Sequence, residues 1–381
     1  MKISIHKFGG SVLNTAQGLQ CLKGILSDDS VKNVVIISAL GKTSSNLKNA
    51  IFQSENGGIS EAKKNVNFLL SEHKILAKSI INEPILSKYE YEIEILSKNI
   101  YKILESVAIT REVSGRTLDR FLAFGEELAA ILIKYYFADN KSVHFLDARE
   151  IIATNSDFTE AKIDKDLTRI NIDNKLVPIL CSCGTVITQG FIASDNNGNT
   201  TTMGFESSNL TATVIADCLD AHELTLWSDI DGIYTADPKI FSNTSLVPYL
   251  SYDTAQLAGN SGLKLIYPAM IDIAKLKNIK LIFRNGLTSS EKFSVISSDN
   301  INDGKLLILN TNIRMEGWDN EVIIINSQKS RIIQFILDKF PELLDSGIMA
   351  FESGFNNKLL KIYFRDEQSA LKFSEEIIGQ L

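Results

Sequence analysis

Two segments of this sequence combine glycines with charged residues at the ends of strand-like runs. The first, Lys7-Phe8-Gly9-Gly10-Ser11, closes the opening run KISIHK. Glycines at a strand end let backbone N–H groups approach a phosphate, and a lysine beside them can neutralise its charge. Taken alone, the segment is also typical of a tight turn with a solvated lysine, so both interpretations stay open.

The second segment, WSDIDGIYTADPK, follows the strand-like run ELTL and carries Asp229 and Asp231 two residues apart. Gly232 permits a turn directly after them. In open α/β sheets, ligands bind at the edge formed by the carboxyl ends of the strands. Paired aspartates there could orient Mg²⁺, or they could only fix the local loop.

The elements that must position these segments alternate between strand and helix. Strand-like runs occupy residues 2–7 and 33–40, and the second is continuously apolar, as in a parallel strand covered on both faces. Helical periodicity fills most of residues 60–136. Further strand-like runs are VHFLD, VPILCSC, ELTLWSD and KLIFRN. This alternation predicts a mostly parallel sheet between two helix layers, an α/β fold.

A second, smaller domain is expected at the C-terminus. The turn-rich stretch SSDNINDG (297–304) indicates a boundary. Beyond it the order is strand, strand, helix, strand, strand, helix, which suggests a small α+β sandwich of ferredoxin-like type. The predicted domains are therefore residues 1–290 and 300–381.

Composition excludes several classes of protein. The chain has 381 residues, 44% hydrophobic and 22% charged, as in a globular protein with a real core. A net charge of −7 without a basic run argues against nucleic acid or an anionic membrane as partner. No signal-peptide core and no apolar run of about 18 residues occurs, so we expect a cytoplasmic protein.

The four cysteines are too few for a disulfide scaffold. Cys181 and Cys183 lie two apart in the strand-like run VPILCSC, where they would share one face. Buried thiols are the simpler interpretation, and a metal or redox pair is the alternative.

At this point the chain resembles a known family, the aspartate kinases. Nine segments occur in the order seen there, covering about residues 2–286: KFGGS, SALGKTSSNL, RTLDRFLAFGEEL, LDAREIIAT, TQGFIASDNNGNTTTMG, WSDIDGIYTADPK, LSYDTAQLA, GLKLIYPA and IKLIFRN. Aspartate kinases are amino acid kinases that use MgATP to phosphorylate the side-chain carboxylate of L-aspartate, the first step towards lysine, threonine and methionine. The resemblance implies a three-layer αβα kinase domain with ATP and Mg²⁺ as cofactors.

The resemblance also implies roles for single residues. Lys7 and Lys264 would compensate charge on the phosphates and are the expected catalytic residues; without the resemblance both are ordinary surface lysines. The expected ATP-binding residues are Lys7, Gly9, Gly10, Ser228, Asp229, Tyr234, Lys239 and Lys264. Tyr267 stands where the family usually has a histidine. The expected substrate-binding residues are Ser38, Ser44, Glu126 and Asn209.

One loop departs from the family pattern. Aspartate kinases usually read Gly-Arg-Gly-Gly-Ser-Asp where this chain has Gly204-Phe205-Glu206-Ser207-Ser208-Asn209. The family's arginine holds a substrate carboxylate and its aspartate helps to bind the ammonium, so Phe205 and Asn209 remove two charges. Glu206 adds a Cβ and a negative charge, which would repel an acidic substrate unless it points away.

Three interpretations of this loop stay open. The chain is an aspartate kinase that compensates through Arg116, Arg120, Arg149 or Lys42, each of which is otherwise a solvated or ion-paired cation. Alternatively, it phosphorylates another small metabolite whose amine contacts Glu206. As a third alternative, it is a catalytically weak homologue that serves as a regulatory or assembly subunit.

The C-terminal segment has room for one ACT-like unit, whereas aspartate kinases commonly have two that bind feedback amino acids and dimerise. A dimerisation module without ligand and a lysine or threonine sensor are both open. Pairing two such units edge to edge would cover exposed strands, so we expect a homodimer. The expected partner is L-aspartate or a related small amino acid, without nucleic acid or membrane.

Overall fold

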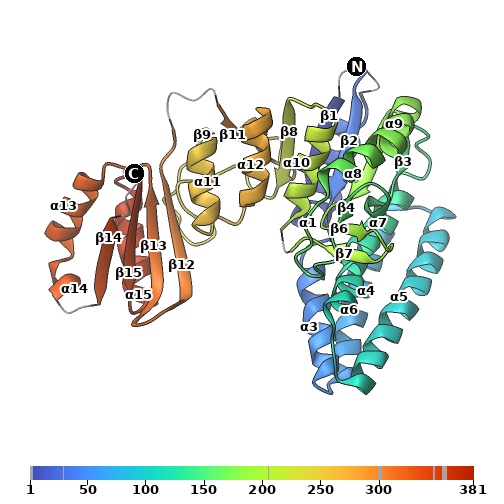
Figure 1. Cartoon of the computed structure of the whole chain (residues 1–381), viewed down its shortest axis with the longest axis horizontal. Helices are drawn as coiled ribbons and strands as arrows, with labels where there is room; N and C mark the ends of the chain where they lie inside the picture. Colours follow the sequence, from blue (N-terminus) through green and yellow to red (C-terminus); the bar gives the residue numbers. More distant parts are fainter. Residues whose placement is uncertain (1–2, 29, 205, 299–302, 346–347, 354–357) are drawn as a thin grey trace. The chain divides into compact units, whose positions relative to one another are not determined.

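The structure is a computed structural model that describes residues 3–28, 30–204, 206–298, 303–345, 348–353 and 358–381. The chain forms two compact units. The first comprises residues 1–229 and 285–290, and the second comprises residues 230–284 and 291–381. Figure 1 shows their elements, coloured from the N-terminus in blue to the C-terminus in red.

The first unit is built on a parallel sheet with the strand order β3-β5-β2-β1-β8. Both neighbours of β1 are parallel to it, and Lys7 lies opposite Ile36 on one side and Leu226 on the other. The strands are β1 (Ile3–Phe8), β2 (Lys32–Ile37), β3 (Val143–Phe145), β5 (Thr185–Gln189) and β8 (Glu223–Ser228). Buried apolar runs such as Val34–Ile37 form its centre, so the predicted mostly parallel sheet is confirmed.

Helices surround this sheet, and the long ones α4 and α5 run side by side with α3 (Figure 1). The helices are α1 (Gly10–Leu13), α2 (Ala16–Ile25), α3 (Thr43–Glu55), α4 (Ile59–Ile80), α5 (Ile85–Thr110), α6 (Gly115–Leu122), α7 (Phe124–Tyr136), α8 (Lys165–Asn171), α9 (Val177–Cys183) and α10 (Ser208–Cys218). Within the helical stretch predicted over residues 60–136, the segment LDRFLAFGEELAAILIKYYF is divided at Ala123 into α6 and α7.

A three-stranded sheet, β4-β6-β7, lies beside the main one in the first unit. Its strands are β4 (Ala153–Thr154), β6 (Ile192–Asp195) and β7 (Thr200–Thr202). Asp119 of α6 anchors β7, because its carboxylate accepts from the backbone N–H and the hydroxyl of Thr202 and from the N–H of Thr159. This anchor fixes the strand that leads into the loop at Gly204.

The prediction of a strand at VPILCSC is wrong. Residues Val177–Cys183 form helix α9, preceded by a π-helical turn over Ile172–Leu176, and the strand follows at β5. A short apolar run fits a buried strand and a buried helix equally well, and Pro178 in the first turn favours the helix. Cys181 and Cys183 therefore do not share a strand face; Cys181 is exposed and Cys183 Sγ donates to Thr185 O.

The second unit contains a mixed group of strands with two helices. Strand β11 (Phe293–Ser297) pairs antiparallel with β10 (Lys280–Asn285) and parallel with β9 (Tyr249–Ser251). Helices α11 (Tyr252–Asn260) and α12 (Pro268–Lys277) lie between these strands in the chain. Asp303 accepts from Ser251 N and Ser251 Oγ, which ties the start of the C-terminal segment to this group.

The C-terminal segment forms an antiparallel sheet of order β12-β13-β15-β14, the order of a ferredoxin-like sandwich. Its elements are β12 (Leu306–Met315), β13 (Trp318–Ile325), α13 (Lys329–Lys339), α14 (Pro341–Asp345), β14 (Met349–Ser353), β15 (Leu359–Phe364) and α15 (Glu367–Ile378). The predicted α+β unit is confirmed. Its core also includes Ala236 and Phe241, which precede the domain boundary predicted at residues 290–300. The position of that boundary stays a prediction.

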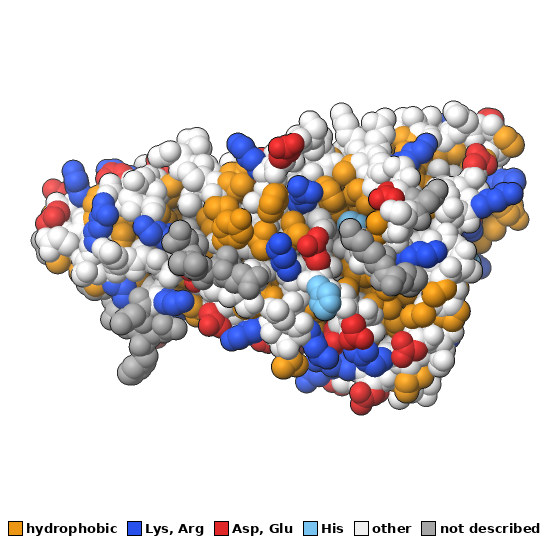
Figure 2. Space-filling model, turned by 90° about the horizontal axis from the view of Figure 1, so that it is seen from above, with side chains coloured by type: hydrophobic (Ala, Val, Ile, Leu, Met, Phe, Trp, Pro, Cys, Tyr) orange, Lys and Arg blue, Asp and Glu red, His pale blue; other side chains and the backbone are white. Residues whose placement is uncertain are grey.

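The surface carries charges of both signs. Figure 2 shows Lys and Arg side chains interspersed with Asp and Glu side chains over the face in view. This mixture agrees with the absence of a basic run in the sequence. Within the described part of the chain, no helix combines the length and the apolar character needed to cross a membrane.

Candidate active site

The turn after β1 brings Lys7, Gly9 and Gly10 against the loop that follows β2. Gly9 N donates to Trp227 O at 2.9 Å, and Gly41 N donates to Gly10 O at 2.9 Å. A Cβ on Gly10 would overlap the carbonyl oxygen of Ala39. A Cβ on Gly9 would lie 3.9 Å from Lys7 Nζ, so the ammonium group lies directly over this turn. Glycine is therefore required for the close approach of two backbone segments.

Asp229 lies at the carboxyl end of β8 beside the same turn. Ser11 Oγ donates to Asp229 Oδ1 at 3.1 Å, a contact between residues 218 positions apart in the chain. Ser228 O accepts from Gly286 N at 2.9 Å. Ser11 is the last residue of KFGGS, and no local pattern in the sequence gave it a role. Its hydroxyl orients the carboxylate that was expected at the nucleotide.

Glu126, near the start of α7, is buried, and the charge of Lys7 acts on it. It is 2% exposed, and its Oε1 accepts from Ala39 N at 3.2 Å. Among the described residues, Glu126 Oε2 and the nearby hydroxyl of Ser38 are buried without a hydrogen-bond partner. Ser44 belongs to the same cluster, because its Oγ would lie 3.4 Å from a Cβ on Gly125. Buried polar atoms without partners are rare, and here they mark a place for a polar ligand.

Burial shifts the pKa of both charged residues in this cluster. Desolvation raises the pKa of Glu126 to about 8, against the opposing hydrogen bond from Ala39 and the charge of Lys7. Desolvation lowers the pKa of Lys7 to about 8, while the negative charges of Glu206 and Glu126 act in the opposite direction. Such displaced pKa values are typical of functional sites.

The divergent loop lies between β7 and α10. Gly204 and Glu206 have φ angles of +85° and +68°, and Ser207 Oγ donates to Gly204 O at 2.7 Å. Phe205 lies outside the described residues. Glu206 is exposed, yet its charge acts on Lys7. Asn209 is in the first turn of α10 and is 9% exposed. The negative charge of Glu206, which was expected to repel an acidic substrate, therefore raises the pKa of Lys7.

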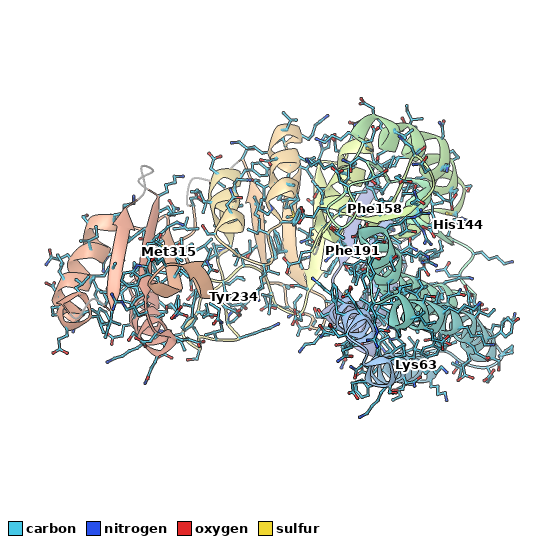
Figure 3. The ribbon with its side chains drawn as sticks, turned by 60° about the horizontal axis from the view of Figure 1, so that its bottom comes forward. Lys63, His144, Phe158, Phe191, Tyr234 and Met315 are labelled. Carbon is cyan, nitrogen blue, oxygen red and sulfur yellow. The ribbon has the colours of Figure 1, made fainter. Side chains whose placement is uncertain are left out.

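The backbone around this loop is held by close packing. A Cβ on Gly190, directly after β5, would lie 2.6 Å from Ser208 Cβ. The next residue, Phe191, is buried with φ +67°, a left-handed conformation that is costly for a bulky residue. Figure 3 labels Phe191 and Phe158 in this part of the first unit. Strained backbone that packing maintains is a feature of functional sites.

The cations considered as substitutes for the missing arginine are engaged elsewhere or exposed. Arg120 and Arg149 both donate to Glu127 Oε1, at 2.8 and 2.7 Å. Arg149 also forms a bidentate ion pair with Asp147. Arg116 and Lys42 are exposed. Arg120 and Arg149 are therefore ion-paired cations, which was the alternative to a role in binding the substrate.

Three predicted nucleotide-binding residues belong to the second unit. Tyr234, labelled in Figure 3, forms an antiparallel bridge with Leu246, and burial raises its pKa. Lys239 N donates to Asp237 Oδ1 at 2.9 Å. Lys264 is exposed in the turn between α11 and α12, where Tyr267 caps α12. Their roles stay predictions.

The residues present fit a magnesium–nucleotide complex. The Gly9 N–H already donates to Trp227 O, so the turn offers the backbone N–H of Gly10. Lys7 offers a positive charge, and Asp229 offers a carboxylate. Over the described ranges, no group of three or more His, Cys, Asp and Glu side chains converges as a metal site. Mg²⁺ commonly binds one or two protein carboxylates together with substrate phosphates and water, so Asp229 would suffice as its protein ligand.

Comparison with protein families matches residues 2–285 to the amino acid kinase family. The chain is 30% identical over 276 residues to lysine-sensitive aspartokinase 3 of Escherichia coli K12, covering 71% of this chain and 58% of the relative. It is 27% identical to aspartokinase 2, chloroplastic, of Arabidopsis thaliana (77% and 54%). It is 23% identical to the chloroplastic bifunctional aspartokinase/homoserine dehydrogenase of Daucus carota (79% and 33%). The chain thus spans about a third to three fifths of these relatives.

Solved structures support the fold. The structure of E. coli aspartokinase III in complex with aspartate and ADP superposes with a TM-score of 0.73 at 22% identity, covering 98% of this chain and 84% of that chain. The Clostridium acetobutylicum aspartate kinase gives a TM-score of 0.61 at 22% identity, with 100% and 82% coverage. At this identity the likeness establishes a shared fold.

Proposed function

The chain belongs to the amino acid kinase family, and on this basis we propose that it is an aspartate kinase, which transfers a phosphoryl group from MgATP to the side-chain carboxylate of L-aspartate. The observation that carries the proposal is the cluster of Lys7, Glu126 and Ser38. It combines a cation with buried oxygens that lack partners, at the carboxyl edge of a parallel sheet. That edge is where ligands bind in such sheets.

The acceptor chemistry suits these residues. An aspartate carboxylate has a pKa of about 3.9 and is ionised at neutral pH, so it needs no general base. MgATP supplies the phosphoryl group and a divalent charge. Lys7 stabilises negative charge that develops during transfer. The backbone N–H of Gly10 orients the phosphates, and the missing side chain of Gly9 lets them approach the turn. Glu126, once ionised, binds the ammonium group of the acceptor, and Ser38 donates to a carboxylate.

By resemblance to the family we also assign Tyr234, Lys239 and Lys264 to the nucleotide, with Lys264 as a second cation on the phosphates. We propose that Ser228 and Asp229 contact the nucleotide and that Ser44 and Asn209 contact the acceptor. We propose that the active chain is a homodimer in which the C-terminal unit pairs across the two-fold axis.

A second candidate function rests on Glu206. Its charge acts on Lys7, in the loop where aspartate kinases usually have a glycine. An acceptor with an additional amine would be attracted by this carboxylate, whereas aspartate would be repelled. A kinase for a small amino acid with an extra cationic group is therefore the alternative.

The deciding experiment is a hydroxamate assay for aspartyl phosphate combined with an ATP-binding titration. We expect turnover of aspartate, reduced about 100-fold or more in Lys7→Met because a preorganised charge is lost. Lys264→Ala should weaken ATP binding. The control is Lys98→Met, since Lys98 is an exposed lysine paired with Glu94 on α5.

Each result has a clear meaning. ATP binding without turnover of aspartate contradicts the first proposal, and a panel of amino acids with an additional amine then tests the second. ATP binding without turnover of any acceptor identifies a catalytically weak homologue. Unchanged ATP binding in Lys264→Ala contradicts the placement of the phosphate site.

A further inference from the structure

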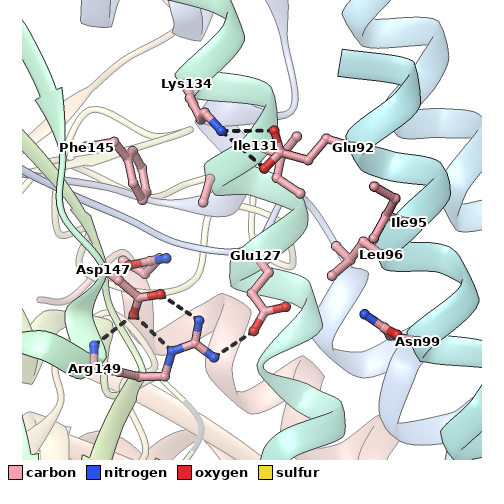
Figure 4. A pocket seen from close by; sticks show the side chains of 12 residues that line it. Glu92, Ile95, Leu96, Asn99, Glu127, Ile131, Lys134, Phe145, Asp147 and Arg149 are labelled. Carbon is pink, nitrogen blue, oxygen red and sulfur yellow. Dashed lines mark hydrogen bonds and ion pairs between the residues drawn. The ribbon is translucent and has the colours of Figure 1, made fainter. Parts of the chain in front are cut away.

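A cavity of about 330 Å³ lies in the first unit, between helices α5 and α7 and the carboxyl ends of β3 and β5 (Figure 4). The cavity is distinct from the proposed active site, because none of Lys7, Ser38, Glu126 and Asp229 lines it. Its volume falls in the lower range of small-molecule sites. At roughly 30 Å³ for each water-sized group, it has room for about ten non-hydrogen atoms.

One side of the cavity is apolar. Ile95 and Leu96 of α5, Ala130 and Ile131 of α7, and Phe145 of β3 line it. Figure 4 shows Phe145 on one side of α7 and the two α5 residues on the other. Ile95 is 45% exposed, which places it where solvent reaches the site. Such walls favour a ligand with an apolar body.

Every charged side chain in the wall is already in an ion pair. Arg149 donates to both oxygens of Asp147 and to Glu127, as the dashed lines in Figure 4 show. Lys134 Nζ donates to both oxygens of Glu92, at 3.2 and 2.9 Å. A charged ligand would have to break one of these pairs or be desolvated without a partner. Both are costly, so the wall favours an uncharged ligand.

Gln189 supplies the one neutral buried hydrogen-bonding side chain among the described residues of this wall. It is 2% exposed, and its Oε1 accepts from Ala148 N at 2.8 Å. Because a backbone N–H can only donate, this bond fixes the orientation of the amide, with Nε2 on the other side. No acceptor for Nε2 occurs in the part of the chain that the structure describes, and Gln189 lines the cavity. Nε2 is not among the buried atoms that lack a partner, so it is accessible from the cavity, where it can donate to a ligand.

We propose that this cavity binds an uncharged small molecule that packs an apolar body against Ile95, Ile131 and Phe145 and presents a carbonyl oxygen to Gln189 Nε2. The site is independent of the kinase proposal, since it needs neither nucleotide nor acceptor. Its polar anchor is a single donor, so selectivity comes from the absence of charge and from shape.

The test compares three probes of nearly equal size by ligand-observed NMR on the full chain: 2-phenylacetamide, phenylacetate and 2-phenylethylamine. We expect 2-phenylacetamide to bind, and both charged analogues to bind roughly tenfold or more weakly because desolvating an unpaired charge is costly. Equal or tighter binding of either charged analogue, or no binding of 2-phenylacetamide at millimolar concentration, overturns the proposal.

Two variants locate the binding. Ile95→Trp fills the solvent side of the cavity at a partly exposed position and should abolish 2-phenylacetamide binding. Phe68→Trp is the matched control, an exposed apolar residue on α4 outside the cavity wall, and it should bind the probe like the parent. Unchanged binding in Ile95→Trp, or equal loss in both variants, contradicts the proposed location.

Gln189→Glu then tests the anchor. It keeps an acceptor for Ala148 N and replaces the donor nitrogen by oxygen. At pH 8 we expect 2-phenylacetamide affinity to fall roughly tenfold, as for the loss of a buried hydrogen bond. Circular dichroism confirms that the variant is folded. If a folded Gln189→Glu protein retains the parental affinity, the carbonyl does not bind at Gln189.

Discussion

At the level of single residues, Lys7 and Glu126 are the two charged residues of the proposed acceptor site. Each has a pKa of about 8 because burial disfavours its charged form. The two shifts have opposite consequences. Glu126 becomes charged only as the pH rises through about 8, whereas Lys7 loses its charge there. The pH range in which both are charged is therefore narrow in the unliganded protein.

The first prediction follows from these two pKa values. We expect kcat/KM for the acceptor to rise with pH as Glu126 ionises, to peak near pH 8, and to fall as Lys7 is deprotonated. Glu126→Gln should abolish the rising limb and increase KM about 10-fold or more, since a charge-assisted contact is lost. Glu105→Gln, at a surface ion pair with Lys63, is the control. A rising limb that persists near pH 8 in Glu126→Gln contradicts the assignment.

The second prediction concerns the charge of Glu206. Glu206→Gln should lower the KM for aspartate, because a negative charge facing an acidic acceptor is removed. The falling limb of the pH profile should move to lower pH, since Glu206 raises the pKa of Lys7. These changes are measured by steady-state kinetics over a pH series.

Glu206→Gly separates charge from backbone. It should give the same kinetic change and also raise the free energy of unfolding by about 1 kcal/mol, because the left-handed conformation at φ +68° is easier for glycine. If neither variant changes the KM for aspartate, Glu206 does not face the acceptor.

At the level of elements, the turn between β1 and α1 depends on close backbone packing. Gly10 has no space for a side chain, because Ala39 O occupies the position of a Cβ. The same turn carries Gly9 under the Lys7 ammonium group. Displacing this turn would therefore disturb both the backbone that we propose to bind phosphate and the loop at Ser38. Asp119 has a comparable role for β7, which leads into Gly204.

The third prediction tests this packing. Gly10→Ala should lower the free energy of unfolding by about 2–3 kcal/mol, as expected for overpacking against a backbone atom. Gly24→Ala is the matched control, since Gly24 lies in helix α2 and a Cβ there would meet open space. It should raise stability by roughly 0.5–1 kcal/mol because alanine favours the helix. Urea denaturation measures both, and equal stability of the two variants would exclude the close packing.

At the level of the whole molecule, the C-terminal sheet does not form its core alone. Ala236 and Phe241, which precede β12 in the chain and lie outside the C-terminal segment, pack with the apolar faces of this sheet and its helices. Leu307 N donates to Thr235 O at 2.7 Å. The segment after β8 and the C-terminal sheet are therefore one folded unit.

The fourth prediction concerns assembly. Removal of residues 304–381 should convert the proposed homodimer into a monomer, since the sheet expected to pair across the two-fold axis is lost. It should also reduce solubility, because Phe241 loses its cover. Light scattering of the full-length and shortened chains under identical conditions measures the mass. A shortened chain that stays dimeric would mean that the interface lies elsewhere.

The sequence by itself determined the fold class, the order of most elements and the family. These follow from periodicity and from local motifs such as KFGGS, which act over a few residues. It also placed Lys7, Gly9, Gly10 and Asp229 at strand ends, because the carboxyl edge of a parallel sheet follows from strand order. It failed at VPILCSC, where a short apolar run does not distinguish helix from strand.

Only the tertiary structure decided which side chains meet. The bond from Ser11 to Asp229, the buried oxygens at Glu126 and Ser38, and the engagement of Arg120 and Arg149 by Glu127 join residues far apart in the chain. The cavity beside Gln189 depends on the packing of α5 and α7 against the ends of two strands. Burial, pKa shifts and missing hydrogen-bond partners are properties of these packed surroundings, and no local pattern of residues encodes them.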